Sequence, residues 1–254
     1  MTLIVDEVML REPNLLVPGK KPVGPVKIDW SHSLSNGLKS FIVPLQINGA
    51  VDLVKGNLPT VLTSTWVARL QGQALENADP TSSLTDQVAY KDDPDYALGA
   101  YPFTVVWSGY LYSYPGAAAG LMARDSSFGA GLWGVYYSDT EFKWACYSSS
   151  FQVTGFSSFT DAQNLPKRVT VIITCDGVSK LNKYTNNIKY TVTDANLIPT
   201  GAGTHIFKFN QYGNTGNSDG IDGYTYHTGI WHRQLSDVEC EQIYADPYQI
   251  LIPA

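Results

Sequence analysis

Residues 222–248 read DGYTYHTGIWHRQLSDVECEQIYADPY and place a β-rich run directly in front of a helix start. The run Asp222–Trp231 is rich in aromatic and β-branched residues, which predicts a strand, and its initial Asp-Gly pair favours a turn. Ser236 and Glu239 have the S-x-x-E spacing of a capping box, in which each side chain binds the backbone N–H of the other residue. The stretch therefore predicts a last strand followed at once by a short helix over Asp237–Tyr244.

The chain upstream of this stretch repeats the strand signal from residue 28 onward. Short β-rich runs are separated by Gly, Pro, Asn and Asp at intervals of about ten residues, which is typical of an antiparallel sandwich. Within Phe103–Ser113, Trp107 and Leu111 alternate with serines and tyrosines, so the two faces of this strand carry different chemistry. We predict an all-β fold of two packed antiparallel sheets. Its strands are Ser40–Pro44, Thr60–Leu70, Phe103–Ser113, Ala117–Arg124, Gly131–Tyr137, Phe142–Tyr147, Val169–Cys175, Ile188–Thr193, His205–Phe209 and Asp222–Trp231, and its core includes Trp107, Leu121, Val171, Ile173, Ile230 and Trp231.

The composition indicates one globular domain and argues against several functions. Of 254 residues, 44% are hydrophobic and 16% are charged, with 22 Gly and 14 Pro. This is the balance of a turn-rich globular chain, and an all-β sandwich of such length forms a single domain. The net charge of −6 and the scattered basic residues predict no binding to nucleic acid. No apolar run reaches about 18 residues and the N-terminus lacks the features of a signal peptide, so we expect no membrane span.

Residues 1–27 differ from the rest and are predicted to form an extended N-terminal arm, with the sandwich domain over 28–254. Repeated Pro and Gly residues prevent a regular helix and favour an extended path. The segment is also too apolar for a solvated terminus, so we expect it to dock on its own domain or on a neighbouring subunit. The residues expected to bind this partner are Val5, Val8, Leu10, Leu15, Leu16 and Val17.

Four stretches resemble the concanavalin A-like (laminin-G-like jelly-roll) domain of tailed-bacteriophage proteins. Residues 18–38 (PGKKPVGPVKIDWSHSLSNGL) are similar to that family's opening segment of the DWSHPLARGL kind, with Ser33 where Pro is usual. Residues 50–57 (AVDLVKGN) resemble the turn after the first core strand, and Arg168–Gly177 resembles the central strand and turn. Residues 222–248 resemble the family's last strand, its R-x-L-S-x-x-E helix start and its final D-P-Y.

This resemblance implies a two-sheet antiparallel jelly-roll β-sandwich and a protein that binds rather than catalyses. We expect a bacteriophage virion structural protein, made in the host cytoplasm: a homo-oligomeric capsid decoration or other head- or tail-attached subunit that binds virion proteins through its arm. The alternative is a tail-fibre module that binds a host carbohydrate or receptor. The hypotheses differ in partner, because a decoration or capsid-linked protein belongs with heads, whereas a fibre module belongs with tails and binds cells.

Catalytic and metal-binding signatures are missing, so we expect no catalytic residue, cofactor or metal. A glycosidase needs two carboxylates on one face, and the nearest pair, Asp139 and Glu141, is better explained as a solvated hairpin turn. The oxygen-rich loop at Asn214, Asn217, Ser218, Asp219 and Asp222 suits Ca²⁺, but its glycines make a plain turn the better explanation. His32 and His232 are expected to form structural hydrogen bonds. Cys146, Cys175 and Cys240 lack metal or disulfide spacing and are expected to be small buried hydrophobic residues.

Tyrosines on one strand are the candidate glycan-binding or interface residues. Tyr110, Tyr112 and Tyr114 alternate along Phe103–Ser113 and beyond it, so they share one face. Tyrosine combines a large apolar ring with a hydroxyl group and can stack on a sugar or fill a protein interface. The tryptophans Trp133 and Trp144 of the next strands are expected to be core residues instead.

Overall fold

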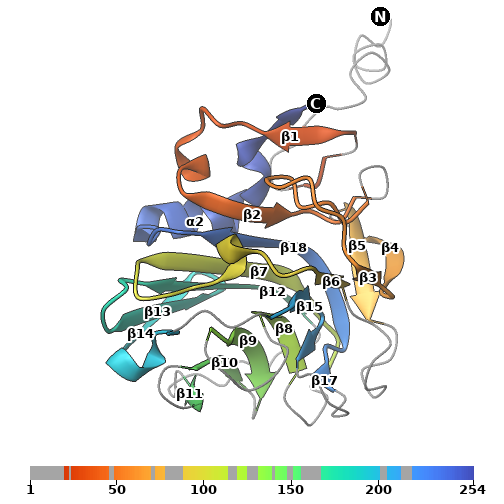
Figure 1. Ribbon diagram of the computed structural model, residues 1–254. Helices are drawn as coiled ribbons and strands as arrows, with labels where there is room; N and C mark the ends of the chain where they lie inside the picture. The colour runs from red at the N-terminus through yellow and green to blue at the C-terminus, as the bar shows by residue number, and fades with distance from the viewer. Residues whose placement is uncertain are drawn as a thin grey trace, which may run out of the picture.

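The computed structural model describes residues 20–22, 24–45, 49–69, 72–77, 88–113, 119–124, 131–138, 141–147, 151–155, 167–200, 205–212 and 219–254. Over these residues two antiparallel sheets pack face to face, and a third layer of N- and C-terminal elements covers the outer side of one of them (Figure 1). The predicted all-β sandwich is confirmed.

The seven-stranded sheet contains the green strands in the lower part of Figure 1. In spatial order it consists of β11 (Phe151–Gly155), β10 (Glu141–Tyr147), β9 (Trp133–Ser138), β8 (Ala119–Arg124), β15 (Phe207–Phe209), β6 (Val88–Tyr90) and β3 (Val61–Leu62).

The eight-stranded sheet lies between the first sheet and the terminal layer. Its order is β14 (Ile188–Thr193), β13 (Lys180–Thr185), β12 (Lys167–Cys175), β7 (Phe103–Leu111), β18 (Gly223–Trp231), β5 (Gly72–Asn77) and β4 (Thr65–Arg69), with β2 (Leu38–Ile42) also paired to β18. A short pair, β16 (Gln211–Tyr212) and β17 (Asp219–Gly220), and the 3-10 turns η2 (Pro94–Tyr96) and η4 (Ala195–Leu197) lie in the connections.

The main core fills the space between the two sheets. The six residues predicted to be buried, Trp107, Leu121, Val171, Ile173, Ile230 and Trp231, are each at most 1% exposed. Buried indole groups keep their hydrogen bonds: Nε1 of Trp133 donates to the Tyr96 carbonyl at 2.8 Å and Nε1 of Trp144 to the Leu197 carbonyl at 2.9 Å. Trp133 and Trp144 are therefore core residues, as predicted from the sequence: their rings are buried and their N–H groups are hydrogen-bonded inside the sandwich.

The third layer joins the two ends of the chain over the eight-stranded sheet (Figure 1). Strand β1 (Val26–Ile28) pairs with β19 (Leu251–Pro253). The 3-10 turn η1 (Ser33–Ser35), helix α2 (Asp237–Ala245) and the turn η5 (Pro247–Ile250) complete the layer. A second apolar cluster, which includes Phe41 and Trp231, lies beneath it.

Helix α2 confirms the predicted capping box at the N-terminus of the helix. The Ser236 side chain accepts from the Glu239 amide and the Glu239 carboxylate accepts from the Ser236 amide. Arg233 donates to both oxygens of Glu239, at 2.9 and 2.7 Å, and its Nε donates to the Asn36 carbonyl at 2.6 Å. The ion pair with Arg233 lowers the pKa of Glu239. Arg233 and Glu239 therefore connect the last helix to the segment around η1, and their role is structural.

Most predicted strands are observed, with boundaries shifted by a few residues. The predicted strand Thr60–Leu70 is instead two strands, β3 and β4, which belong to different sheets. Strands β5 and β13 were not predicted, because polar residues occupy inward positions. In β13, for example, Lys183 is fully buried, and its Nζ donates to the Phe142 carbonyl at 3.4 Å. Strands β1, β6, β11 and β19 are also absent from the sequence prediction, since each has only three to five residues.

The part of residues 1–27 that the structure describes packs on its own domain. Lys21 is 5% exposed, and its Nζ donates to the Pro44 carbonyl at 3.2 Å. The expected partner-binding residues Val5, Val8, Leu10, Leu15, Leu16 and Val17 lie outside the described residues, so an arm that binds a partner stays a prediction. Among the described helices, none is long and apolar enough to span a membrane.

Candidate functional site

A cluster of tyrosines occupies the outer side of the eight-stranded sheet, next to the area that the terminal layer covers. Tyr110 of β7 lies directly opposite Tyr224 of β18 in the strand register. The register of β18 shifts between Thr225 and His227, and Tyr226 then packs beside Tyr224 on the same outer side. Such a bulge redirects side chains locally. The sheet thus brings together tyrosines from two strands that are far apart in the sequence.

The four rings form one continuous contact. Tyr110 stacks on Tyr224 with 5.3 Å between ring centroids and 7° between planes. Tyr112 meets these two rings edge-on, at 5.5 and 5.8 Å, and Tyr226 meets Tyr224 edge-on at 5.2 Å. Offset-stacked and edge-on arrangements are the favourable geometries for aromatic rings. The cluster is therefore pre-formed without a ligand.

Two charged side chains from β4 and β5 hold the outermost ring. The guanidinium of Arg69 lies 4.9 Å above the centroid of Tyr224 and donates to the Tyr112 hydroxyl at 2.9 Å. Tyr112 in turn donates to Oε1 of Glu76 at 2.7 Å, and Arg69 also donates to that carboxylate. We call the set Tyr110, Tyr112, Tyr224, Tyr226, Arg69 and Glu76 the tyrosine face.

Tyr112 is the ring that this face offers to solvent. It is 37% exposed, whereas Tyr224 is 5% and Tyr226 is 3% exposed. Burial and the hydrogen bond to Glu76 raise the pKa of Tyr112 to about 12, so its hydroxyl stays protonated at neutral pH. The site combines an apolar ring with a cation, a carboxylate and hydroxyl groups. These groups can stack against a polyhydroxylated ligand and exchange hydrogen bonds with it.

The structure brings two of the three predicted tyrosines, Tyr110 and Tyr112, into this face, while Tyr114 lies outside the described residues. The other four residues of the face, Tyr224, Tyr226, Arg69 and Glu76, were not predicted from the sequence. The i, i+2 spacing of Tyr224 and Tyr226 indicates that these two side chains share one face of a strand. Their position next to Tyr110, however, depends on a pairing between strands that are distant in the sequence.

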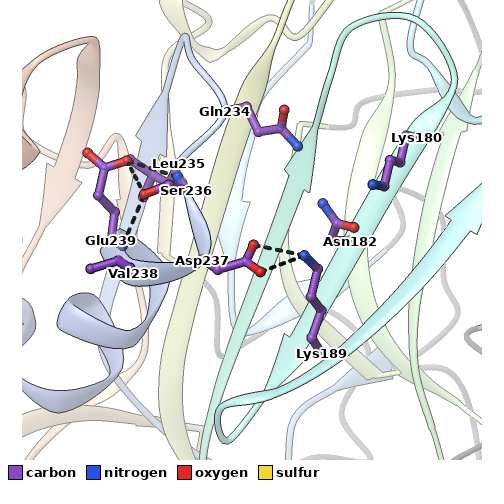
Figure 2. A pocket seen from close by; sticks show the side chains of 9 residues that line it. All are labelled: Lys180, Asn182, Lys189, Gln234, Leu235, Ser236, Asp237, Val238 and Glu239. Atoms are coloured by element: carbon purple, nitrogen blue, oxygen red, sulfur yellow. Dashed lines mark hydrogen bonds and ion pairs between the residues drawn. The ribbon is translucent and has the colours of Figure 1, made fainter.

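A groove of about 570 Å³ opens elsewhere, where the start of α2 faces β13 and β14 (Figure 2). Lys189 and Asp237 point toward each other in it, with Nζ 2.8 Å from both carboxylate oxygens. Tyr184 also donates to Asp237, at 2.7 Å. The central charges of this groove thus neutralise each other. None of the described residues that line it is aromatic, so it is a weaker candidate than the tyrosine face.

The other candidate groups behave as structural residues where the structure describes them. Nδ1 of His32 accepts from the Leu34 amide at 3.2 Å, and Nε2 of His232 contacts the Asp95 carbonyl at 3.0 Å. The three cysteines are free and buried, and burial raises the pKa of each thiol to about 12, as expected for buried small residues.

The carboxylate turn and the oxygen-rich loop lie largely outside the described residues. Glu141 pairs with Ser138 at the ends of β10 and β9, which are joined by a two-residue connection, but Asp139 is not described. The same holds for Asn214, Asn217 and Ser218. Within the described part of the chain, no group of three or more His, Cys, Asp or Glu residues is placed to hold a metal ion.

Comparison with known proteins supports the fold. No protein-family model matches the sequence, and no curated protein matches it. The binding domain of Paraclostridial Mosquitocidal Protein 1 is similar in structure, with a TM-score of 0.65 and 13% identity over 84% of this chain and 52% of that one. The binding domain of Botulinum Neurotoxin DC, in complex with SialylT, gives 0.61 and 12% over 84% and 52%. Trypanosoma rangeli sialidase, in complex with sialic acid, gives 0.58 and 16% over 84% and 33%.

These neighbours share the β-sandwich architecture with this chain. At 12 to 16% identity the likeness shows the fold alone. The chain spans about half the length of the toxin binding domains and about a third of the sialidase.

Proposed function

We propose that this chain is a non-enzymatic, glycan-binding β-sandwich domain and that the tyrosine face is its binding site. The observation that carries the proposal is the half-exposed ring of Tyr112, held in place by Arg69 and Glu76. A sugar presents one apolar face and a rim of hydroxyl groups. The ring provides the stacking surface, and the guanidinium and carboxylate provide a donor and an acceptor for the rim.

The rigidity of the face supports this function. Each ring of the tyrosine face contacts another, and both charged groups are fixed by hydrogen bonds before a ligand arrives. A pre-organised site loses less conformational entropy on binding. Two of the structural neighbours were solved with sialyl ligands, which supports glycans as the class of ligand without assigning any particular sugar.

Replacement of Tyr112 by alanine is expected to weaken glycan binding at least tenfold while leaving the fold intact. The variant removes the stacking ring and its bonds to Arg69 and Glu76, and a loss of about 1.4 kcal/mol corresponds to a factor of ten. A glycan array identifies the ligand, and calorimetry with the best glycan measures the affinity. The same glycan should be recovered without hydrolysis after long incubation.

Tyr244→Ala is the matched control, because Tyr244 lies on α2, away from the tyrosine face, and is also 37% exposed. It is expected to bind like the unmodified protein. Equal affinity of the Tyr112 and Tyr244 variants would show that the tyrosine face is not the site, and turnover of the glycan would contradict a purely binding function.

The biological setting that we propose for this domain is a bacteriophage virion. The proposal is supported by the resemblance of residues 18–38, 50–57 and 222–248 to the jelly-roll domains of tailed phages. In the structure the first and last of these stretches are in contact, since Arg233 of the last donates a hydrogen bond to the Asn36 carbonyl of the first. The subunit would be anchored to a capsid or tail protein by the apolar residues of its N-terminal arm and would expose the sandwich, either as a decoration protein or as a fibre module.

Deletion of residues 1–17 tests this setting. We expect the truncated protein to fold normally, because the described contacts of the N-terminal segment begin at residues 20–22. We also expect it to be lost from purified particles, since the removed segment holds Val5, Val8, Leu10, Leu15, Leu16 and Val17, the predicted anchor. Circular dichroism and particle composition are measured side by side, and normal incorporation of the truncated protein would rule out the arm as the anchor.

A further inference from the structure

Trp30 is the most exposed aromatic residue among those that the structure describes. Its exposed fraction is 60%, whereas Trp107, Trp133, Trp144 and Trp231 are fully buried. Burial of a tryptophan side chain stabilises a folded protein by several kcal/mol. The exposed ring of Trp30 does not contribute this stabilisation, so we considered a role in binding. The ring borders a hollow of about 520 Å³, which is within the size range of ligand sites.

The segment that carries Trp30 is held rigidly by its neighbours. Oδ1 of Asp29 accepts from the amide and the hydroxyl of Ser31, at 2.9 and 2.6 Å, and the Ser35 hydroxyl donates to the Asp29 carbonyl at 2.7 Å. Gly37 closes the segment with a φ of +74°, and a Cβ there would lie 3.0 Å from Arg233, whose guanidinium binds the Asn36 carbonyl. The exposed ring therefore sits on a fixed scaffold.

Polar groups with free hydrogen-bonding capacity surround the ring. The side chains of Ser33 and Asn36 line the hollow and make no hydrogen bond to another described residue. Nδ1 of His32 is used by the Leu34 amide, which leaves Nε2 for a ligand. A hydroxyl, an amide and a ring nitrogen beside one exposed indole match the requirements of a sugar ring: an apolar face to stack and hydroxyl groups to pair.

We propose that the hollow beside Trp30 is a second glycan-contact site, which takes a single hexose-like unit stacked on the indole ring. This inference rests on the proposed glycan-binding function for its ligand class but uses residues that the tyrosine face does not contain. The polar lining favours a sugar over an apolar protein partner, because the hydroxyl, amide and ring nitrogen beside the indole can each exchange a hydrogen bond with a sugar hydroxyl group.

The two sites lie at opposite ends of one sheet. Trp231, whose indole donates to the Leu34 carbonyl beside the hollow, pairs with Thr104 at the start of β7, and Tyr112 follows the end of β7. A nine-residue strand is about 30 Å long at about 3.3 Å per residue. One sugar unit cannot reach both sites, whereas a long or densely displayed glycan can. Two weak sites on one rigid domain raise the avidity for such a surface.

Iodide quenching of tryptophan fluorescence tests the second site directly, because four of the six tryptophans are fully buried and Trp30 dominates the quenchable signal. The probes are methyl glycosides of the common hexoses and N-acetylhexosamines at millimolar concentration. We expect at least one of them to protect Trp30 from iodide by twofold or more in the unmodified protein and in Tyr112→Ala. In Trp30→Ala the quenchable signal should fall to the small part that comes from the partly buried Trp66, and calorimetry should show one glycan site fewer.

Val238→Ala serves as the control, since Val238 is 62% exposed on α2 and its loss should change neither protection nor stoichiometry. Glycan binding that needs Tyr112 but leaves Trp30 equally quenchable would overturn the second site and leave the proposed function standing. Absence of glycan binding in every assay would overturn both. Unchanged sugar binding by Trp30→Ala, together with loss of a virion protein from its complex, would instead make Trp30 a protein contact and contradict the proposal.

Discussion

Replacement of Asp52 by alanine is expected to lower the free energy of unfolding by about 3–5 kcal/mol, as is typical when one partner is removed from a buried charged network. Asp52 is fully buried in the stretch 50–57. Its Oδ1 accepts from the amides of Phe41 and Val54, at 3.2 and 3.0 Å, and its Oδ2 accepts from the Tyr96 hydroxyl at 3.0 Å. One carboxylate thus joins β2, the following turn and η2. The alanine variant would leave three donors without their acceptor, and two of them, the Phe41 amide and the Tyr96 hydroxyl, are buried.

Denaturant unfolding followed by circular dichroism measures this effect. Asp93→Ala is the matched control, because the Asp93 carboxylate caps η2 and pairs with Lys55 but is 25% exposed. We expect it to cost about 1 kcal/mol, as for a helix cap. A loss at Asp52 no larger than the loss at Asp93 would contradict the structural role assigned to Asp52.

The folded protein is expected to lose stability below pH 6.5 because of His227. This side chain is 1% exposed, and neither ring nitrogen has a hydrogen-bond partner among the described residues. Burial, together with the positive charges of Lys21 and Arg168, lowers the pKa of His227 well below its usual value. The surrounding rings of Phe41 and Tyr248 offer no anion to stabilise a charged imidazole.

The direction of the effect follows from proton binding. Below pH 6.5 the unfolded chain binds a proton at this histidine and the folded chain does not, so the stabilisation that is present above pH 6.5 is lost as the pH falls toward the lowered pKa. The slope approaches about 1.4 kcal/mol per pH unit for one proton. In His227→Phe, which fills a similar volume with an apolar ring, this part of the pH dependence should disappear. Unfolding free energies at pH 7.5 and 5.0 measure it, and equal pH dependence in both proteins would contradict the assignment.

The sequence predicted best what local signals encode. The capping box of Ser236 and Glu239 needs only four consecutive residues, so the helix position was correct within one residue. The alternation along β7 likewise identified a strand with two different faces. Strand β13 was missed because its buried Lys183 and Asn182 are satisfied by partners that only the folded chain supplies, and no local pattern shows this.

The candidate site was predicted in part for the same reason. Tyr110 and Tyr112 could be found because their strand alternates, but the rest of the face comes from β4, β5 and β18. Tyr224 reaches Tyr110 through strand pairing across more than a hundred residues, and Arg69 reaches Tyr112 through a hydrogen bond between distant strands. Trp30 was not predicted as a site residue. It lies in the stretch 18–38, which was interpreted as structural, and only the folded chain shows that its ring is exposed whereas four other tryptophans are buried.

Tyrosine NMR during a glycan titration tests the proposed binding site most directly. The protein is labelled with ¹³C in its tyrosine rings, and the Tyr112 and Tyr244 signals are assigned from the single alanine variants. With the best glycan from the array, the Tyr112 ring signals should shift and saturate at the affinity found by calorimetry, while the equally exposed Tyr244 signals should stay in place. A glycan that binds while the Tyr112 signals remain unchanged would contradict the tyrosine face as the site of recognition.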